Sequence, residues 1–140
     1  MSMRASNLIT TGSWTPILKF GGVDVTDVSV GGGVAVTGKY GKIGPFVLIS
    51  GAINLSPKGT PSGLMTIEGV PFDSDATYML TWGMFNGWHA LPATAYWEAA
   101  ILTSTIYAYR FVAGSPTQLD DTDVVNASEI IFTGLYMTAA

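Results

Sequence analysis

His89 is the only histidine in this chain of 140 residues, so a serine-type catalytic triad or a histidine-based metal site would have to include it. It lies between Trp88 and Ala90 in a segment rich in turn residues, and the chain contains neither a nucleophile-elbow pattern nor the helical spacing of a zinc site. Glu68 and Glu98 have the chemistry of a glycosidase pair, but nothing in the sequence brings them together. The sequence therefore predicts a protein without enzymatic activity and a surface or interface position for His89.

Two acidic pairs have a spacing that a hard cation accepts. Asp73 and Asp75, and also Asp121 and Asp123, place carboxylates two positions apart in turn-rich segments. Neither pair is followed by the further ligands of a calcium-binding loop, which favours solvated turn residues. We expect no cofactor and no metal site, and the spacing leaves open whether either loop holds a cation.

Five aromatic residues gather in one stretch of the sequence, at Trp82, Phe85, Trp88, Tyr96 and Trp97. Carbohydrate-binding surfaces use exposed aromatic rings to stack sugars, whereas hydrophobic cores and protein interfaces bury the same residue types. We favour core or interface packing for this group, with glycan binding as the alternative.

Charged residues make up 11% of the chain, less than half of the roughly 25% typical of soluble domains. Because the mean hydropathy is also high, at +0.38, we expect part of the surface to be buried in an oligomer. The net charge of −4 argues against binding to nucleic acid. Every apolar run ends well before the ~20 residues of a membrane span, and the N-terminus lacks the apolar core of a signal peptide. We therefore expect a protein that is made in a cytoplasm and contacts no membrane.

Residues 39–55 predict the hairpin around which the fold is built, with its turn at Gly44-Pro45. Over residues 47–55, every second position is apolar wherever it carries a side chain, which is the pattern of a strand facing a core. Phe46 and Leu48 make the start of the opposite face apolar as well, so we expect both faces to lose water there. Phe46 and Leu48 are therefore candidates for an oligomer interface.

Short strands separated by turn signals recur along the chain at intervals of roughly 8 to 12 residues, which is typical of all-β sandwiches and barrels. The clearest are residues 106–112, with aliphatic residues and an arginine on one face and aromatic residues on the other, and residues 129–138. We predict an antiparallel β-sandwich of about eight strands, jelly-roll-like. A single domain is expected over residues 13–140, after an N-terminal arm over residues 1–12.

Three short motifs follow one another in the first half of the chain. They read G-x-W-T-P at residues 12–16, Y-x-K-I-G at residues 40–44 and I-x-G-x-P-F at residues 67–72, with Val70 at a position usually occupied by leucine. In this order and spacing they resemble a module of tailed-bacteriophage virion proteins, common at the ends of tail fibres and in other trimeric virion appendages. The likeness covers most of the chain. It implies a trimeric β-sandwich with a structural or receptor-binding role and no catalytic residues.

The resemblance is compatible with two roles: a capsid decoration (cement) protein on the outer shell, or a receptor-binding module of a tail fibre or tailspike that recognises host surface polysaccharide. A fibre tip needs an upstream shaft or adaptor, and about a dozen residues before Trp14 are too few to form one. They suit a capsid-anchoring arm in which Met3, Leu8 and Ile9 are apolar anchors and Arg4 supplies a charge, and three arms per trimer add avidity. We therefore expect a homotrimeric decoration protein that binds itself and the major capsid protein, with host glycan as the partner in the alternative. Its expected location is the virion, assembled in the host cytoplasm.

Overall fold

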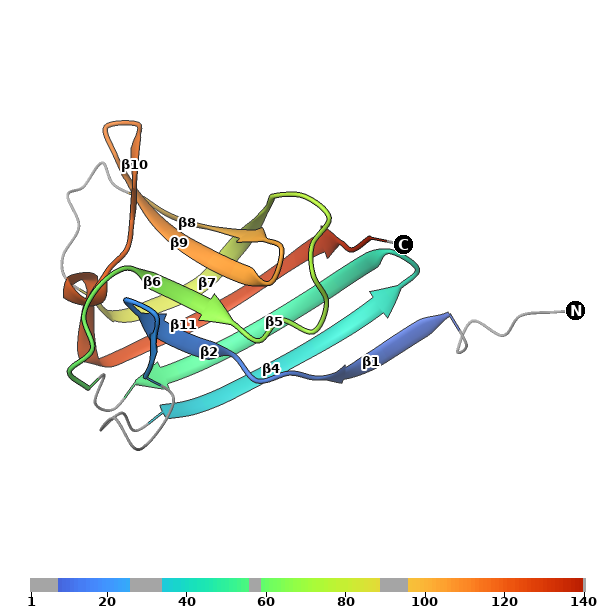
Figure 1. Ribbon diagram of the computed structural model, residues 1–140, viewed down its shortest axis with the longest axis horizontal. Coiled ribbons are helices and arrows are strands. Elements are labelled where there is room, and N and C mark those ends of the chain that lie inside the picture. Colours follow the sequence, from blue (N-terminus) through green and yellow to red (C-terminus); the bar gives the residue numbers. More distant parts are fainter. Residues whose placement is uncertain (1–7, 26–33, 56–58, 89–95, 140) are drawn as a thin grey trace, which may run out of the picture.

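The computed structural model describes residues 8–25, 34–55, 59–88 and 96–139 (Figure 1). Its strands are β1 (Ile9–Ser13), β2 (Ile17–Phe20), β3 (Val23–Asp24), β4 (Val34–Ile43), β5 (Phe46–Leu55), β6 (Met65–Glu68), β7 (Tyr78–Trp88), β8 (Tyr96–Leu102), β9 (Thr105–Val112), β10 (Ser115–Gln118) and β11 (Val124–Met137). A single turn of 3-10 helix, η3 (Asp121–Asp123), leads into β11.

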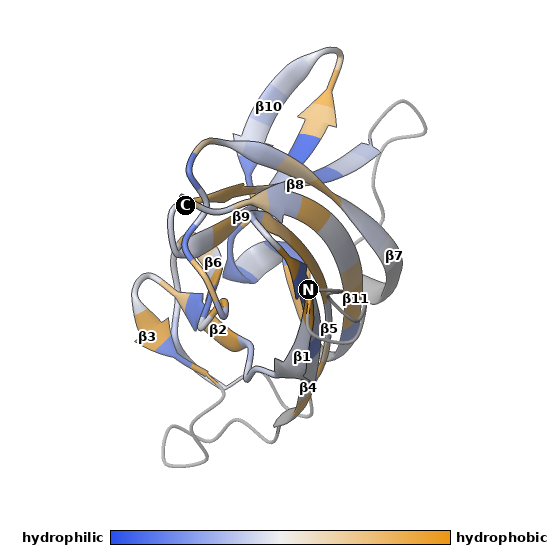
Figure 2. Cartoon of the chain, turned by 90° about the vertical axis from the view of Figure 1, so that its right-hand side faces the viewer, coloured by the Kyte–Doolittle hydropathy of each residue, from blue (hydrophilic) through white to orange (hydrophobic). Residues whose placement is uncertain are grey.

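The strands form one antiparallel sheet in the order β1-β4-β5-β11-β7-β8-β9-β6-β2-β3, with β10 paired to β9. Strand β7 joins two halves of this sheet, because residues 78–80 pair with β8 and residues from Thr81 onward pair with β11. The register between β11 and β7 shifts between Ile131 and Phe132, and such bulges bend and twist a sheet. Seen along the long axis of the molecule, the curled sheet surrounds a common interior (Figure 2).

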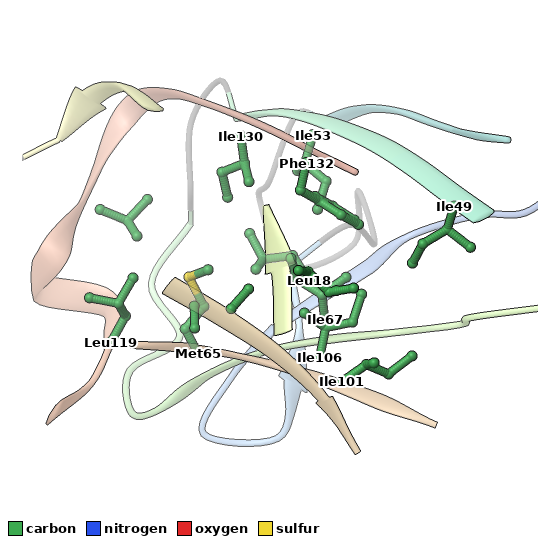
Figure 3. Close-up of a cluster of buried hydrophobic side chains, with 14 of the residues drawn as sticks. Leu18, Ile49, Ile53, Met65, Ile67, Ile101, Ile106, Leu119, Ile130 and Phe132 are labelled. Atoms are coloured by element: carbon green, nitrogen blue, oxygen red, sulfur yellow. The ribbon is translucent and has the colours of Figure 1, made fainter. Parts of the chain in front are cut away.

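The two halves of the curled sheet face each other across a hydrophobic core (Figure 3). On β5 every second residue points inward, and Val47, Ile49 and Ile53 are fully buried. Ile130 and Phe132 of β11 are buried beside them. The opposite half contributes the buried side chains of Leu18, Phe20, Met65, Ile67, Ile101 and Ile106. Because the core occupies the interior, the outward-pointing residues of both halves are left for contacts with other molecules.

The all-β, antiparallel class predicted from the sequence is confirmed. The described residues form eleven strands rather than about eight, in part because the short strands β1 and β10 become strands by pairing with a neighbour and lack a pattern of their own. Residues 9–12 of the predicted arm belong to β1, where Ile9 pairs with Ile43 of β4. The division into arm and domain stays a prediction. Within the described part of the chain, no helix is long and apolar enough to cross a membrane.

Candidate functional site

The first sequence motif packs on β4 and β5 where the chain passes from β1 towards β2. Trp14 is buried, and its indole N–H donates to the carbonyl oxygens of Lys39 and Ser50, at 3.2 and 3.1 Å. A Cβ at Gly38 would lie 2.5 Å from the Trp14 carbonyl oxygen and 2.7 Å from its Nε1 atom, so only glycine fits there. Trp14 of the first motif and Gly38 of β4 therefore fix how the start of the chain packs on β4 and β5.

The third motif packs against the second. The rings of Phe72 and Tyr40 meet edge to face, with centroids 5.3 Å apart. The Tyr136 hydroxyl donates to the Phe72 carbonyl oxygen at 2.8 Å, and burial raises the pKa of Tyr136 to about 12. Gly69 has a φ of +86°, and a Cβ there would lie 2.4 Å from the Thr15 carbonyl oxygen. The aromatic residues of the motifs, Trp14, Tyr40 and Phe72, thus hold the fold together.

The acidic pair Asp121 and Asp123 belongs to η3, where both carboxylates accept hydrogen bonds from the protein. Asp123 is buried and accepts from Arg110 Nη1 at 2.5 Å and from the Asp120 N–H at 3.0 Å. Asp121 accepts from the Gly63 N–H at 2.7 Å. These contacts tie η3 to β9 and to the segment before β6, which is the role of a structural turn.

The other acidic pair, Asp73 and Asp75, is exposed. Asp75 accepts a hydrogen bond from the Tyr78 hydroxyl at 2.6 Å, and this bond raises the pKa of Tyr78. Among the residues that the structure describes, no three histidine, cysteine, aspartate or glutamate side chains gather as metal ligands would.

Glu68 and Glu98 lie on opposite sides of β9. The β6 neighbour of Glu68 pairs with Ile106, whereas Glu98 pairs with Tyr109. Glu68 is therefore level with Thr105, so the two backbone positions are about 13 Å apart along β9 and two strand spacings apart across it, farther than the carboxylates of a glycosidase pair. Glu68 instead forms an ion pair with Lys19, with Nζ and Oε2 2.6 Å apart.

The aromatic group that the sequence singled out divides in the structure. The rings of Trp82 and Phe132 meet edge to face at 5.6 Å, and Trp97 also packs against the hydrophobic core. Tyr96, in contrast, is half-exposed. Core packing thus accounts for Trp82 and Trp97. Five predicted site residues have side chains outside the described part of the structure: Phe85, Trp88, His89, Met3 and Arg4.

An apolar patch covers one end of the outer face of the first half of the sheet, near the β4–β5 turn (Figure 1, right). It consists of Ile9, Ile43, Phe46, Leu48 and Leu135, which are 48–57% exposed. The register places Ile43 beside both Ile9 and Phe46, and Leu48 beside Leu135. These side chains and Gly41 line a groove of about 220 Å³. Sequence reasoning identified Ile9, Phe46 and Leu48 as candidates, and the strand register adds Ile43 and Leu135.

A second outward-facing group, which we name the aromatic row, consists of Tyr96, Tyr107, Tyr109 and Phe111. On β9 the row alternates with Ile106 and Ala108, which are buried, so the tyrosines point away from the core. Tyr96 of β8 lies opposite Phe111, and the two rings stack in parallel with centroids 4.9 Å apart and planes 2° apart. The sequence shows the alternation on β9 but does not show which face is outermost.

No protein-family model and no curated protein matches the chain. Among solved structures, the fold is similar to part of the Dettilon tailspike protein (gp208), with a TM-score of 0.72 and 20% sequence identity. This chain has the fold of a tailspike segment. The similarity covers 92% of this chain and 24% of the tailspike chain, so the chain spans about a quarter of the tailspike's length.

Proposed function

We propose that this chain is a homotrimeric module of a bacteriophage virion appendage, of tailspike or tail-fibre type, and that it contributes to binding of the host surface. The observation that supports the proposal most is the fold shared with the Dettilon tailspike over 92% of the chain. The three motifs that resemble the ends of tail fibres, at residues 12–16, 40–44 and 67–72, agree with it.

The apolar patch supplies the surface that a trimer would bury. Burying the exposed half of each of its five side chains contributes roughly 1 kcal/mol per side chain, or about 5 kcal/mol per subunit before the cost of association. The patch reaches β1, which among the described strands pairs on one side only, with β4. A free strand edge beside an apolar surface offers backbone groups for pairing with a second copy.

Light scattering on the purified chain tests this assembly. We expect three times the chain mass of 14.7 kDa. Leu48→Glu should give a monomer, because each subunit would bring a carboxylate into an apolar interface. The matched control is Leu102→Glu, at an exposed leucine at the end of β8, which should stay trimeric. A wild-type monomer at micromolar concentration, or a trimeric Leu48→Glu variant, would contradict the proposal.

The place in the virion is tested separately, by immunogold labelling of intact particles with antibodies against this chain. Label on the tail is the expected result. Label spread over the head shell would refute the appendage role and leave the trimer untouched.

Capsid decoration is the second candidate, and the exposure of Leu8 and Ile9 favours it. Both side chains are about half-exposed, as the anchors of an arm would be, and Ile9 belongs to the apolar patch. Hundreds of copies per virion in a quantitative gel would support decoration, and a few tens or fewer would support a tail. If the chain decorates capsids, deleting residues 1–8, which leaves β1 intact, should give a folded trimer that no longer binds them.

A further inference from the structure

We infer that the aromatic row is a binding surface for a neutral glycan, with sugar rings stacked on the side chains of β8 and β9. This inference rests on the proposed function in one respect only: the proposed function makes the host surface the source of the glycan. The row lies on the second half of the sheet, whereas the apolar patch lies on the first, so one subunit can use both surfaces at once.

The geometry of the row suits a chain of sugars. Tyr107, Tyr109 and Phe111 occupy alternate positions of one strand, so their side chains follow one another at intervals of about 7 Å. Tyr96 extends the row onto β8 by stacking on Phe111. Pyranose rings have an apolar face of C–H groups that packs on aromatic rings, and a row of rings lets one oligosaccharide make several such contacts.

The charges beside the row indicate which glycans fit. Glu98 lies directly opposite Tyr109, and its carboxylate can accept hydrogen bonds from sugar hydroxyls. Two described cations lie near the row, and both are paired: Lys19 of β2 with Glu68, and Arg110, on the other face of β9, with Asp123. Among the described residues, an anionic sugar would therefore meet a carboxylate and no unpaired cation to offset the repulsion, whereas the hydroxyls of a neutral sugar would be satisfied.

The shape of the exposed surface distinguishes a glycan from a second copy of the chain. The apolar patch is a continuous apolar surface over four strands, as the core of a protein interface is. The aromatic row is a line of rings, and its central residue Tyr109 lies between two polar neighbours, Glu98 of β8 and Gln118 of β10. A narrow line of rings with hydrogen-bonding groups beside its centre matches an extended oligosaccharide better than a broad protein surface.

The test applies the purified full-length chain to an array of neutral and anionic bacterial surface polysaccharides, followed by calorimetric titration of those it retains. We expect the chain to bind at least one neutral glycan and to bind no anionic glycan more tightly. Tyr109→Ala should weaken binding at least tenfold, about 1.4 kcal/mol, and Tyr109→Phe, which keeps the ring, should retain most of the affinity. Glu98→Gln should weaken binding several-fold. The matched control Val112→Ala removes a partly exposed side chain from the end of the same strand and should change nothing.

Circular dichroism and the oligomer mass of every variant accompany the titration, and Tyr107→Ala serves as a second truncation. The inference is overturned if the wild-type chain binds no neutral glycan, or if Tyr109→Ala and Tyr107→Ala both bind it with unchanged affinity. It is also overturned if these two variants no longer form a trimer, because the row would then belong to an interface between copies of the chain. A trimer that binds no glycan refutes this inference alone. A monomer that binds neutral glycan through Tyr109 refutes the proposed assembly and leaves the inference standing.

Discussion

Gly51 and Phe132 allow a strict test of how the core is packed. A Cβ added at Gly51 would lie 2.4 Å from Cζ and 2.8 Å from Cε1 of Phe132, against the 3.5–4.0 Å of a favourable carbon contact. The Phe132 ring cannot easily retreat, because Trp14 and Trp82 contact it edge to face, with centroid distances of 5.9 and 5.6 Å. We therefore expect Gly51→Ala to lower the free energy of unfolding by about 2 kcal/mol, the usual cost of overpacking.

Phe132→Leu should reverse the sign of that effect, because leucine lacks the outer ring atoms that the new methyl group would meet. Alone, Phe132→Leu is expected to cost roughly 1–2 kcal/mol through the cavity it leaves. In that background the Gly51→Ala methyl is buried in free space and adds up to about 1 kcal/mol of stability. The coupling energy between the two substitutions is then about 2–3 kcal/mol.

Urea unfolding monitored by tryptophan fluorescence measures the four variants of this cycle, at one fixed protein concentration because assembly also contributes to stability. Additive effects of Gly51→Ala and Phe132→Leu, within about 0.5 kcal/mol, would refute the steric reasoning. So would a wild-type-like Gly51→Ala variant, since it would mean that the ring moves at no cost.

Two further predictions concern polar groups in the fold. Burial holds the pKa of Tyr136 at about 12, against about 10 in the unfolded chain, so the unfolded chain loses this proton first. The contribution of the protonated hydroxyl to the free energy of unfolding is complete below pH 10 and falls by roughly 2 kcal/mol as the pH rises to 12. Urea unfolding at pH 9 and pH 11 measures this loss, and the Tyr136→Phe variant should lose less stability between the two pH values than the wild-type chain. Asp123→Ala removes a buried carboxylate that accepts from Arg110 and from the Asp120 N–H, and thermal unfolding should show a loss of about 2–3 kcal/mol. The control Asp73→Ala, at an exposed turn, should change stability by less than about 0.5 kcal/mol.

Strand β5 shows how far the local pattern determines the site. Its alternation predicts the buried face, and Val47 and Ile49 are fully buried as expected. Phe46 and Leu48 were predicted at an oligomer interface, and the structure leaves both about half-exposed, while that interface itself stays a prediction. Leu135, which completes the patch beside Leu48, comes from β11, far away in the sequence. No local pattern predicts that register, because it depends on which strands become neighbours.

Strand β9 shows why the aromatic row was missed. Both of its faces are largely apolar, so the period-2 pattern shows which residues share a face but not which face points towards the core. The direction follows from tertiary neighbours: Ile106 pairs with Ile67 on one side and Ile101 on the other, and this aliphatic face closes the core. Trp82 and Trp97, the aromatics that the sequence made prominent, pack against the core because a large ring satisfies a core position as well as a binding site.

The aromatic residues of the motifs pack inside the fold, which limits what the resemblance to virion appendages says about binding. Tyr40 and Phe72 pack against each other, and Trp14 donates hydrogen bonds to β4 and β5, so all three serve the fold whatever the chain binds. Tyr107 and Tyr109 point away from the core, where a substitution changes the surface at little cost in stability. The motifs are therefore informative about the fold, whereas the ligand has to be argued from the surface that the motifs hold in place.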